Sequence, residues 1–224
     1  MMLKLPVSRI EELFAQIDGE RALYLPVEAN GLVAFGRWAP GLAPQLGRLL
    51  ANRPVKDFFF PQTENLATFR TLGKEIRIEE NRDPAEPFAV FGLRPCDAES
   101  VLILDRVFLS DPVDTFYQAR RQNSVLITLA CSAPEESCFC AAFGIDAADP
   151  GGDIATWIRD GILYCDSRTD KGEALTARVR DLFMEADGRD REAVEQAQAA
   201  TRAILDRLPL KGLDLDGFGG DNLM

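Results

Sequence analysis

Two continuous apolar runs stand out at the centre of the chain, "PFAVFGL" at residues 87–93 and "SVLITLA" at residues 124–130. Runs of this kind, without polar alternation, are typical of strands that are covered on both faces of a sheet. Between them, residues 97–108 have the apolar spacing of a helix, with Asp97 as a possible N-cap. A strand, a helix and a second strand in this order predict a βαβ unit with two parallel strands.

The flanking segments extend the α/β pattern. Ser8 and Glu11 have capping-box spacing and precede apolar residues at helical intervals, which predicts a helix near the N-terminus. The dipeptide Asn30-Gly31 separates two apolar runs and predicts a β-hairpin. The other predicted elements are a helix over 42–50, a half-strand and half-loop segment around Pro61, a strand over 161–168, and helices over 171–186 and 191–208.

These elements predict one α/β fold. We expect a mixed sheet with a central βαβ unit, an N-terminal helix and hairpin, and a C-terminal helical tail. Residues 1–190 are expected to form a single α/β domain, and residues 191–224 a helix followed by an extended tail. The glycine-rich "GFGGD" at 217–221 follows no predicted strand and opens no predicted helix, which disfavours a phosphate-binding loop there.

Composition narrows the functional classes. The chain of 224 residues is 46% hydrophobic and 27% charged, which is ordinary for a globular protein. A net charge of −11 disfavours binding to nucleic acid, because such a chain repels phosphate backbones. The sequence has no apolar run of about 20 residues that could cross a membrane. The early polar residues argue against a secretory signal, and five cysteines, an odd number, indicate reduced thiols, so we expect a cytoplasmic protein.

Four of the five cysteines are predicted to converge at one edge of the sheet. Cys96 follows the first buried strand, Cys131 follows the second directly, and Cys138 and Cys140 lie in the next loop. The carboxyl ends of parallel strands share the edge where α/β proteins bind ligands. Cys96 also begins a helix, where the partial positive charge favours a thiolate. Cys165 lies within a predicted strand and is expected to be an ordinary core residue.

The absence of histidine from the sequence limits the chemistry of these thiols. Mixed Cys/His zinc sites and His-assisted cysteine nucleophiles are excluded, and C-x-C lacks the geometry of a C-x-x-C redox pair. The spacing C-x34-C-x6-C-x-C has no paired zinc knuckles. A [4Fe–4S] cluster accepts four thiolates from such irregular spacing, whereas a four-cysteine zinc site or simple packing of the thiols remains the alternative.

Two segments, "GLRPCDAESVLILDRVF" and "YQARRQNSVLITLACSAPEESCFC", resemble the N-terminal domain of one family. This family contains the beta subunit of sulfhydrogenase and the A subunit of anaerobic sulfite reductase. The likeness extends over residues 50–186 and includes the upstream "KDFFFPQTENL". The positions that match the family pattern are Arg94, Pro95, Cys96, Asp97, Asp111, Asp114, Tyr117, Arg120, Arg121, Cys131, Pro134, Cys138, Phe139 and Cys140.

The resemblance implies an iron–sulfur electron-transfer subunit of a redox complex, with no catalytic residue and no flavin or NAD of its own. Cys96, Cys131, Cys138 and Cys140 are the implied ligands of one [4Fe–4S] cluster. The implied partners are a flavin/NAD(P)H subunit, a ferredoxin-like chain, and a hydrogenase, sulfite reductase or heterodisulfide-reductase module. The alternative is a non-redox structural or assembly subunit that uses the same thiols for zinc or for packing.

Further expectations concern the length of the chain and the neighbours of the cysteines. The family usually continues into a ferredoxin-like segment with two clusters, and this sequence ends at Met224 before such a segment. We therefore expect one cluster at most, in a fragment or in a short form with a separate ferredoxin partner. Phe139 is expected to shield sulfur from water or to pack in the core. Arg120 and Arg121 are expected to hold the aspartate-rich segment, to dock an acidic partner, or to lie in solvent.

Overall fold

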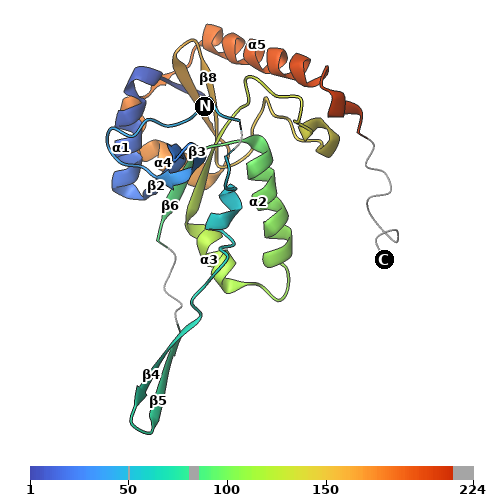
Figure 1. Ribbon diagram of the computed structural model, residues 1–224. Helices are drawn as coiled ribbons and strands as arrows, with labels where there is room; N and C mark the ends of the chain where they lie inside the picture. The colour runs from blue at the N-terminus through green and yellow to red at the C-terminus, as the bar shows by residue number, and fades with distance from the viewer. Residues whose placement is uncertain (50, 81–85, 214–224) are drawn as a thin grey trace.

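The computed structural model describes residues 1–49, 51–80 and 86–213 (Figure 1). The strands are β1 (Leu3–Pro6), β2 (Ala22–Ala29), β3 (Leu32–Arg37), β4 (Ala67–Leu72), β5 (Glu75–Glu80), β6 (Phe88–Leu93), β7 (Ser124–Leu129), β8 (Ile154–Arg159), β9 (Ile162–Ser167) and β10 (Met184–Glu185). The α-helices are α1 (Ile10–Glu20), α2 (Pro95–Phe108), α3 (Thr115–Asn123), α4 (Asp170–Arg178) and α5 (Gly188–Leu205). Short 3-10 helices are η1 (Val7–Arg9), η2 (Val55–Phe58), η3 (Cys140–Phe143), η4 (Arg180–Leu182) and η5 (Pro209–Gly212).

Eight of these strands form one mixed sheet in the order β10-β1-β9-β8-β7-β6-β2-β3. β2, β6, β7 and β8 are parallel neighbours, and the remaining pairs are antiparallel. The predicted βαβ unit is confirmed as β6-α2-α3-β7, although α3 was not predicted. The α/β class with a mixed sheet, an N-terminal helix and hairpin, and a C-terminal helix is therefore confirmed.

Helices cover both faces of the large sheet (Figure 1). Phe14 of α1 and Leu175 of α4 pack in the cluster on one face, while Val101 of α2 and Tyr117 of α3 pack on the other. α5 packs through Val194 on the same side as α2, against β8 and β9. Within the described residues, no helix is both long and apolar enough to span a lipid bilayer.

The two layers explain why the central strands read as continuous apolar runs. In β7, Val125 and Ile127 face α1 and α4, whereas Leu126 faces α2 and α3. Successive side chains of a strand point to opposite faces, so a strand with helices on both faces favours apolar residues at consecutive positions. The same pattern identified β6 correctly, since all six of its residues are buried.

The prediction that Ser8 and Glu11 form a capping box at the N-terminal helix was wrong. Leu3 and Leu5 are buried in β1, which pairs with β9, and a 3-10 turn leads from it into α1. The N-cap of α1 is Arg9, without a side-chain cap, and the Glu11 carboxylate accepts a hydrogen bond from the backbone N–H of Gly41 at 2.7 Å. The Asn30-Gly31 hairpin between β2 and β3 is confirmed.

Three further predictions need correction. Residues 42–49 contain no helix, and Leu42 and Leu46 pack against the core from a loop; residue 50 lies outside the described part. The helix predicted over 171–186 ends at Arg178, because the following apolar side chains turn into the core and Met184 pairs with β1. The helix predicted over 191–208 begins earlier, since Asp187 accepts N-cap hydrogen bonds from the backbone of α5, and it ends at Leu205.

The C-terminal tail is partly outside the described residues. Residues 209–212 form a 3-10 turn, and the rest of the expected extended tail, including 217–221, lies in the undescribed 214–224. The predicted boundary at residue 190 falls within α5, and the division into 1–190 and 191–224 stays a prediction.

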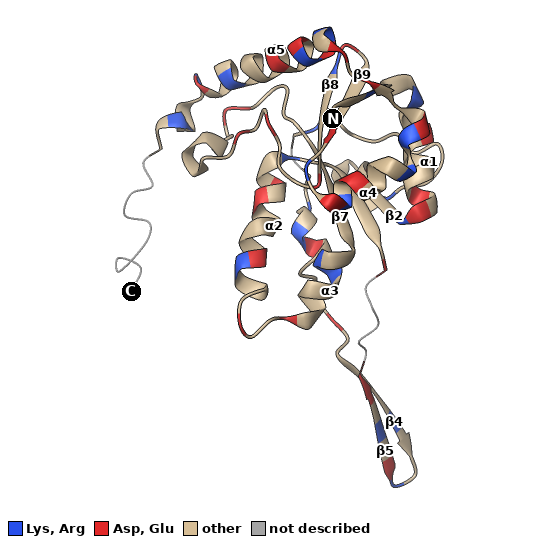
Figure 2. Ribbon diagram, turned by 180° about the vertical axis from the view of Figure 1, so that it is seen from behind, with Lys and Arg blue, Asp and Glu red and all other residues tan. Residues whose placement is uncertain are grey.

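The hairpin of β4 and β5 projects away from the eight-stranded sheet and carries both acidic and basic side chains (Figure 2). Phe69 pairs with Ile78 across the strands, and both side chains are more than 60% exposed, at 67% and 63%. A two-stranded hairpin without a third layer is marginally stable in water. We infer that this hairpin contributes little to the stability of the domain.

Substitutions in this hairpin are therefore expected to leave the unfolding free energy nearly unchanged. Ile78→Thr should alter it by less than about 0.5 kcal/mol, as for other exposed positions. Leu25→Ala, at a fully buried position of β2, should cost about 2–5 kcal/mol. Urea unfolding followed by circular dichroism measures both, and a loss for Ile78→Thr close to that of Leu25→Ala would contradict the inference.

Candidate metal centre

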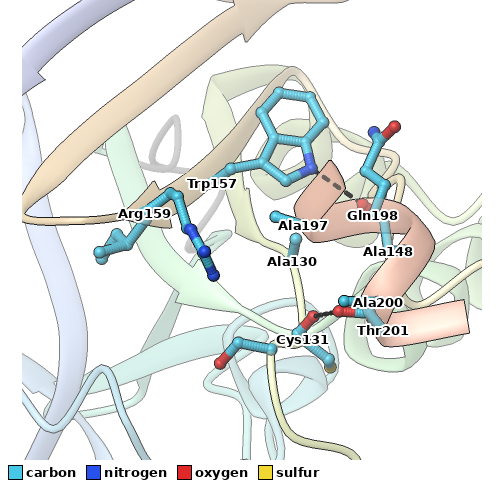
Figure 3. Close-up of a pocket in the computed structure, with 11 residues that line it drawn as sticks. Ala130, Cys131, Ala148, Trp157, Arg159, Ala197, Gln198, Ala200 and Thr201 are labelled. Atoms are coloured by element: carbon cyan, nitrogen blue, oxygen red, sulfur yellow. Dashed lines mark hydrogen bonds between the residues drawn. The ribbon is translucent and has the colours of Figure 1, made fainter. Parts of the chain in front are cut away.

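Cys96 and Cys131 lie at the carboxyl ends of the parallel neighbours β6 and β7. Cys96 is half-buried in the first turn of α2, directly after Pro95. Cys131 is buried, and its backbone N–H donates to the Ala147 carbonyl at 2.9 Å. The hydroxyl of Thr201 in α5 donates to the Cys131 carbonyl at 2.9 Å (Figure 3). Two distant segments therefore fix the backbone at Cys131.

The loop after Cys131 brings two more thiols back to the same edge. A turn forms where the backbone N–H of Cys138 donates to the Glu135 carbonyl at 2.9 Å. In return, the backbone N–H of Glu135 donates to the sulfur of Cys138 at 3.3 Å. Cys140 opens the 3-10 turn η3, and both Cys138 and Cys140 pack against the small apolar cluster of Cys131, Ala147 and Leu205.

The thiol that follows β6 interacts with a thiol of the loop that follows β7. The side chains of Cys96 and Cys140 interact, and this interaction is the largest cause that raises the pKa of Cys96 and lowers the pKa of Cys140. Burial raises the pKa of Cys131 to about 11, and the charges of Cys96 and Cys138 act on it in the same direction. The predicted convergence of the two segments is thus present in the structure.

Whether these thiols bind a metal stays a prediction. Within the described residues, no group of three or more Cys, His, Asp or Glu side chains is arranged so that it could hold a metal ion. The chemical type of the donors nevertheless fits an iron–sulfur cluster, which is held by cysteine thiolates. Four cysteine thiols lie near one another at one edge of the sheet, and the chain contains no histidine. Cys165, by contrast, is buried in the core between the sheet and α4, as predicted.

Arg94 connects two segments next to the candidate site by hydrogen bonds. Its guanidinium donates to the carbonyls of Leu46 and Arg48 at 2.5 and 2.7 Å, and to those of Ala130 and Leu129 at 3.1 and 3.5 Å. The loop before η2 is thereby tied to the end of β7. Sequence reasoning missed both this network and the Thr201 contact; a charged residue directly after an apolar strand was the available signal for Arg94.

The expectation for Asp97 needs a correction. Arg94, not Asp97, is the N-cap of α2, and the Asp97 carboxylate accepts the backbone N–H of Arg94 at 3.4 Å from within the first turn. Burial raises the pKa of Asp97, against the opposing effect of this hydrogen bond. Asp97 thus helps to close the helix start that carries Cys96.

The two arginines of α3 do not hold the aspartate-rich segment. Arg120 pairs with Glu64, and Arg121 pairs with Asp105 at 3.0 Å. Asp114 instead caps α3 by accepting the first backbone N–H groups of that helix. These ion pairs also contradict the expectation of arginines lying free in solvent, whereas docking of an acidic partner is untested.

Phe139, between two candidate ligands, is 51% exposed and meets Phe143 edge-on, with ring centroids 5.5 Å apart. The prediction that this ring packs in the core is therefore wrong, and shielding of sulfur stays a prediction.

A pocket of about 80 Å³, lined in part by Cys131, opens between α5 and β8 (Figure 3). Trp157 forms one wall and donates its indole N–H to the Ala148 carbonyl at 2.8 Å.

Fold and site together define an α/β domain with a cysteine-rich edge. No protein-family model matches the chain. Over 152 residues, it is 31% identical to the sulfhydrogenase 2 subunit beta of Pyrococcus furiosus. The chain is thus a homologue of a sulfhydrogenase beta subunit, which supports the family that its motifs predict. The aligned part covers 68% of this chain and 44% of the relative's length.

Proposed function

We propose that this chain is an iron–sulfur electron-transfer subunit of a redox complex. Cys96, Cys131, Cys138 and Cys140 would hold one [4Fe–4S] cluster. The observation that carries the proposal is the convergence of the four thiols, in which Cys96 after β6 interacts with Cys140 of the loop that follows β7, and Cys138 and Cys140 pack against Cys131. The homology to a sulfhydrogenase beta subunit supports the same assignment.

Such a cluster supplies reversible one-electron transfer when it is bound. The chain's own residues hold and surround it. The N-terminus of α2 would place its partial positive charge beside a bound thiolate of Cys96, although the contact with Cys140 and burial raise the pKa of this thiol in the metal-free chain. The backbone N–H of Glu135 stabilises negative charge on the sulfur of Cys138, and the burial of Cys131 limits access of water. Hydrogen bonds to sulfur and burial are the factors by which a protein sets a cluster potential.

The proposed partners are other subunits of the complex. Electrons would pass between a hydrogenase, sulfite reductase or heterodisulfide-reductase module and a flavin/NAD(P)H subunit, with a ferredoxin-like chain as a further carrier. We place this complex in the cytoplasm, where thiols stay reduced. The chain itself would bind no flavin or NAD and would carry out no bond-making step.

Metal and sulfide analysis tests the proposal. The full chain is purified without oxygen, reconstituted with iron and sulfide, and freed of unbound metal. We expect about four iron and four sulfide ions per chain, and a paramagnetic signal after reduction with dithionite. One zinc ion without sulfide would instead favour the structural alternative. A protein that binds neither would contradict both metal assignments and would favour simple packing of the thiols.

A further inference from the structure

Arg94 is a buried cation whose charge is not balanced by a salt bridge to a carboxylate anywhere in the part of the chain that the structure describes. Its exposed fraction is 5%. All four hydrogen bonds of the guanidinium go to backbone carbonyls, two in the loop at Leu46 and Arg48 and two at the end of β7. Charged side chains are rarely buried to this degree unless they are paired. The position of Arg94 therefore calls for a nearby negative charge.

The candidate ligands are the groups that can supply this charge. Arg94 precedes Cys96 by two residues, and its guanidinium donates to the carbonyl of Ala130, the residue directly before Cys131. Burial lowers the pKa of the Arg94 guanidinium, and negative charge on Cys131 or Cys96 acts in the opposite direction. Asp97 also contributes, although its hydrogen bond goes to the backbone N–H of Arg94 rather than to the guanidinium.

Four carbonyls also make Arg94 a structural tie. They come from two segments that are 46–48 and 35–36 positions away in the sequence. Lysine could offer a similar charge but not the planar fork that reaches several acceptors at once. Removal of the guanidinium would take this donor away from one buried and three partly buried carbonyls, at a cost in stability.

We propose that Arg94 is a positioning residue that ties the 46–48 loop and the end of β7 around the cysteine edge and supplies the fixed positive charge that balances the bound thiolates. This inference rests on the proposed function. Reduction adds one negative charge to the site, and a buried cation nearby favours the reduced state. Loss of the charge should therefore move the reduction potential to more negative values.

The test compares Arg94→Gln and Arg94→Lys with wild type. Arg106→Gln is the matched control, because Arg106 is on the same helix with a side chain that is 76% exposed, and pairs with Glu99 at 3.7 Å. The midpoint potential of the reconstituted protein is followed by paramagnetic resonance during redox titration. Thermal unfolding of the metal-free chain is measured in parallel and does not depend on a cluster.

We expect Arg94→Gln to show a more negative potential and a lower unfolding temperature of the metal-free chain. Arg94→Lys should keep a potential near that of wild type but lose part of the stability, and Arg106→Gln should change neither. A loaded Arg94→Gln protein with the wild-type potential overturns the charge role, and so does a loss of cluster binding in Arg94→Lys equal to that in Arg94→Gln. Loss of cluster binding in Arg94→Gln alone supports it.

The two proposals can fail separately. If wild type binds no cluster, the proposed function fails, and the metal-free chains still test the structural tie. Equal unfolding temperatures for wild type and Arg94→Gln would then overturn that role of Arg94 as well.

Discussion

Replacing Cys138 and Cys140 together with serine is expected to reduce the iron and sulfide content of the reconstituted chain to less than about one tenth of the wild-type value. The hydroxyl of serine does not ionise near neutral pH and is a poor substitute for a thiolate ligand. Cys138 and Cys140 also form the part of the donor set that the loop brings back to the strand ends. The two remaining thiols, Cys96 and Cys131, could not complete a four-thiolate set.

Cys165→Ser is the matched control for this change. Cys165 is 5% exposed and packs in the core with Leu175 of α4 and with Val179, which follows that helix. Its replacement should leave iron and sulfide at wild-type levels and lower the unfolding free energy by about 1–3 kcal/mol, because a hydroxyl is buried in apolar surroundings. Full iron content in the Cys138/Cys140 variant, or equal loss in Cys165→Ser, would contradict the assigned ligands.

The local sequence was sufficient to predict the strands at the centre of the fold and the β2–β3 hairpin. β6 and β7 were predictable because both faces of each strand are covered, so most of their side chains are apolar. The β2–β3 hairpin was predictable because Asn30 and Gly31 adopt positive φ angles of 55° and 78°, which few other residue pairs tolerate. In each case the determining interactions lie within a few residues or within one strand.

Elements that depend on distant partners were not predictable in this way. β1 is four residues long and exists because Leu3 and Leu5 pair with β9, more than 150 residues later. β10 is only two residues long and requires β1 in turn. Residues 42–49 have some helical composition but follow the core as a loop, since Arg94 holds the Leu46 carbonyl from 48 positions away.

The site was predictable to the extent that topology alone determines it. Two parallel strands place Cys96 and Cys131 at one edge, and a short loop keeps Cys138 and Cys140 near Cys131. The hydrogen bond from Thr201 to the Cys131 carbonyl joins residues 70 positions apart, and the local sequence around either residue does not predict it. The candidate thiols could thus be identified from the sequence, whereas the residues that position them could be identified only from the structure.

Gly92 is expected to be the most sensitive glycine near the site. A bulge at this position lets Phe91 face α1 while Leu93, two residues later, faces α2. In a regular strand these two side chains would share a face, so the bulge decides how the chain enters Arg94 and Cys96. Gly92 has φ +83°, and a Cβ added there would lie 3.1 Å from Leu46 Cδ2.

Gly92→Ala should therefore lower the unfolding free energy by about 2–5 kcal/mol, from backbone strain together with crowding. Gly161→Ala is the control, because Gly161 has φ +76° but no heavy atom within 4 Å of its added Cβ. It should cost about 1–2 kcal/mol, from strain alone. Urea unfolding of the metal-free chains measures both, and reconstitution should give less iron for Gly92→Ala than for Gly161→Ala. Equal losses in stability would show that the close approach of Leu46 to Gly92 does not constrain the bulge.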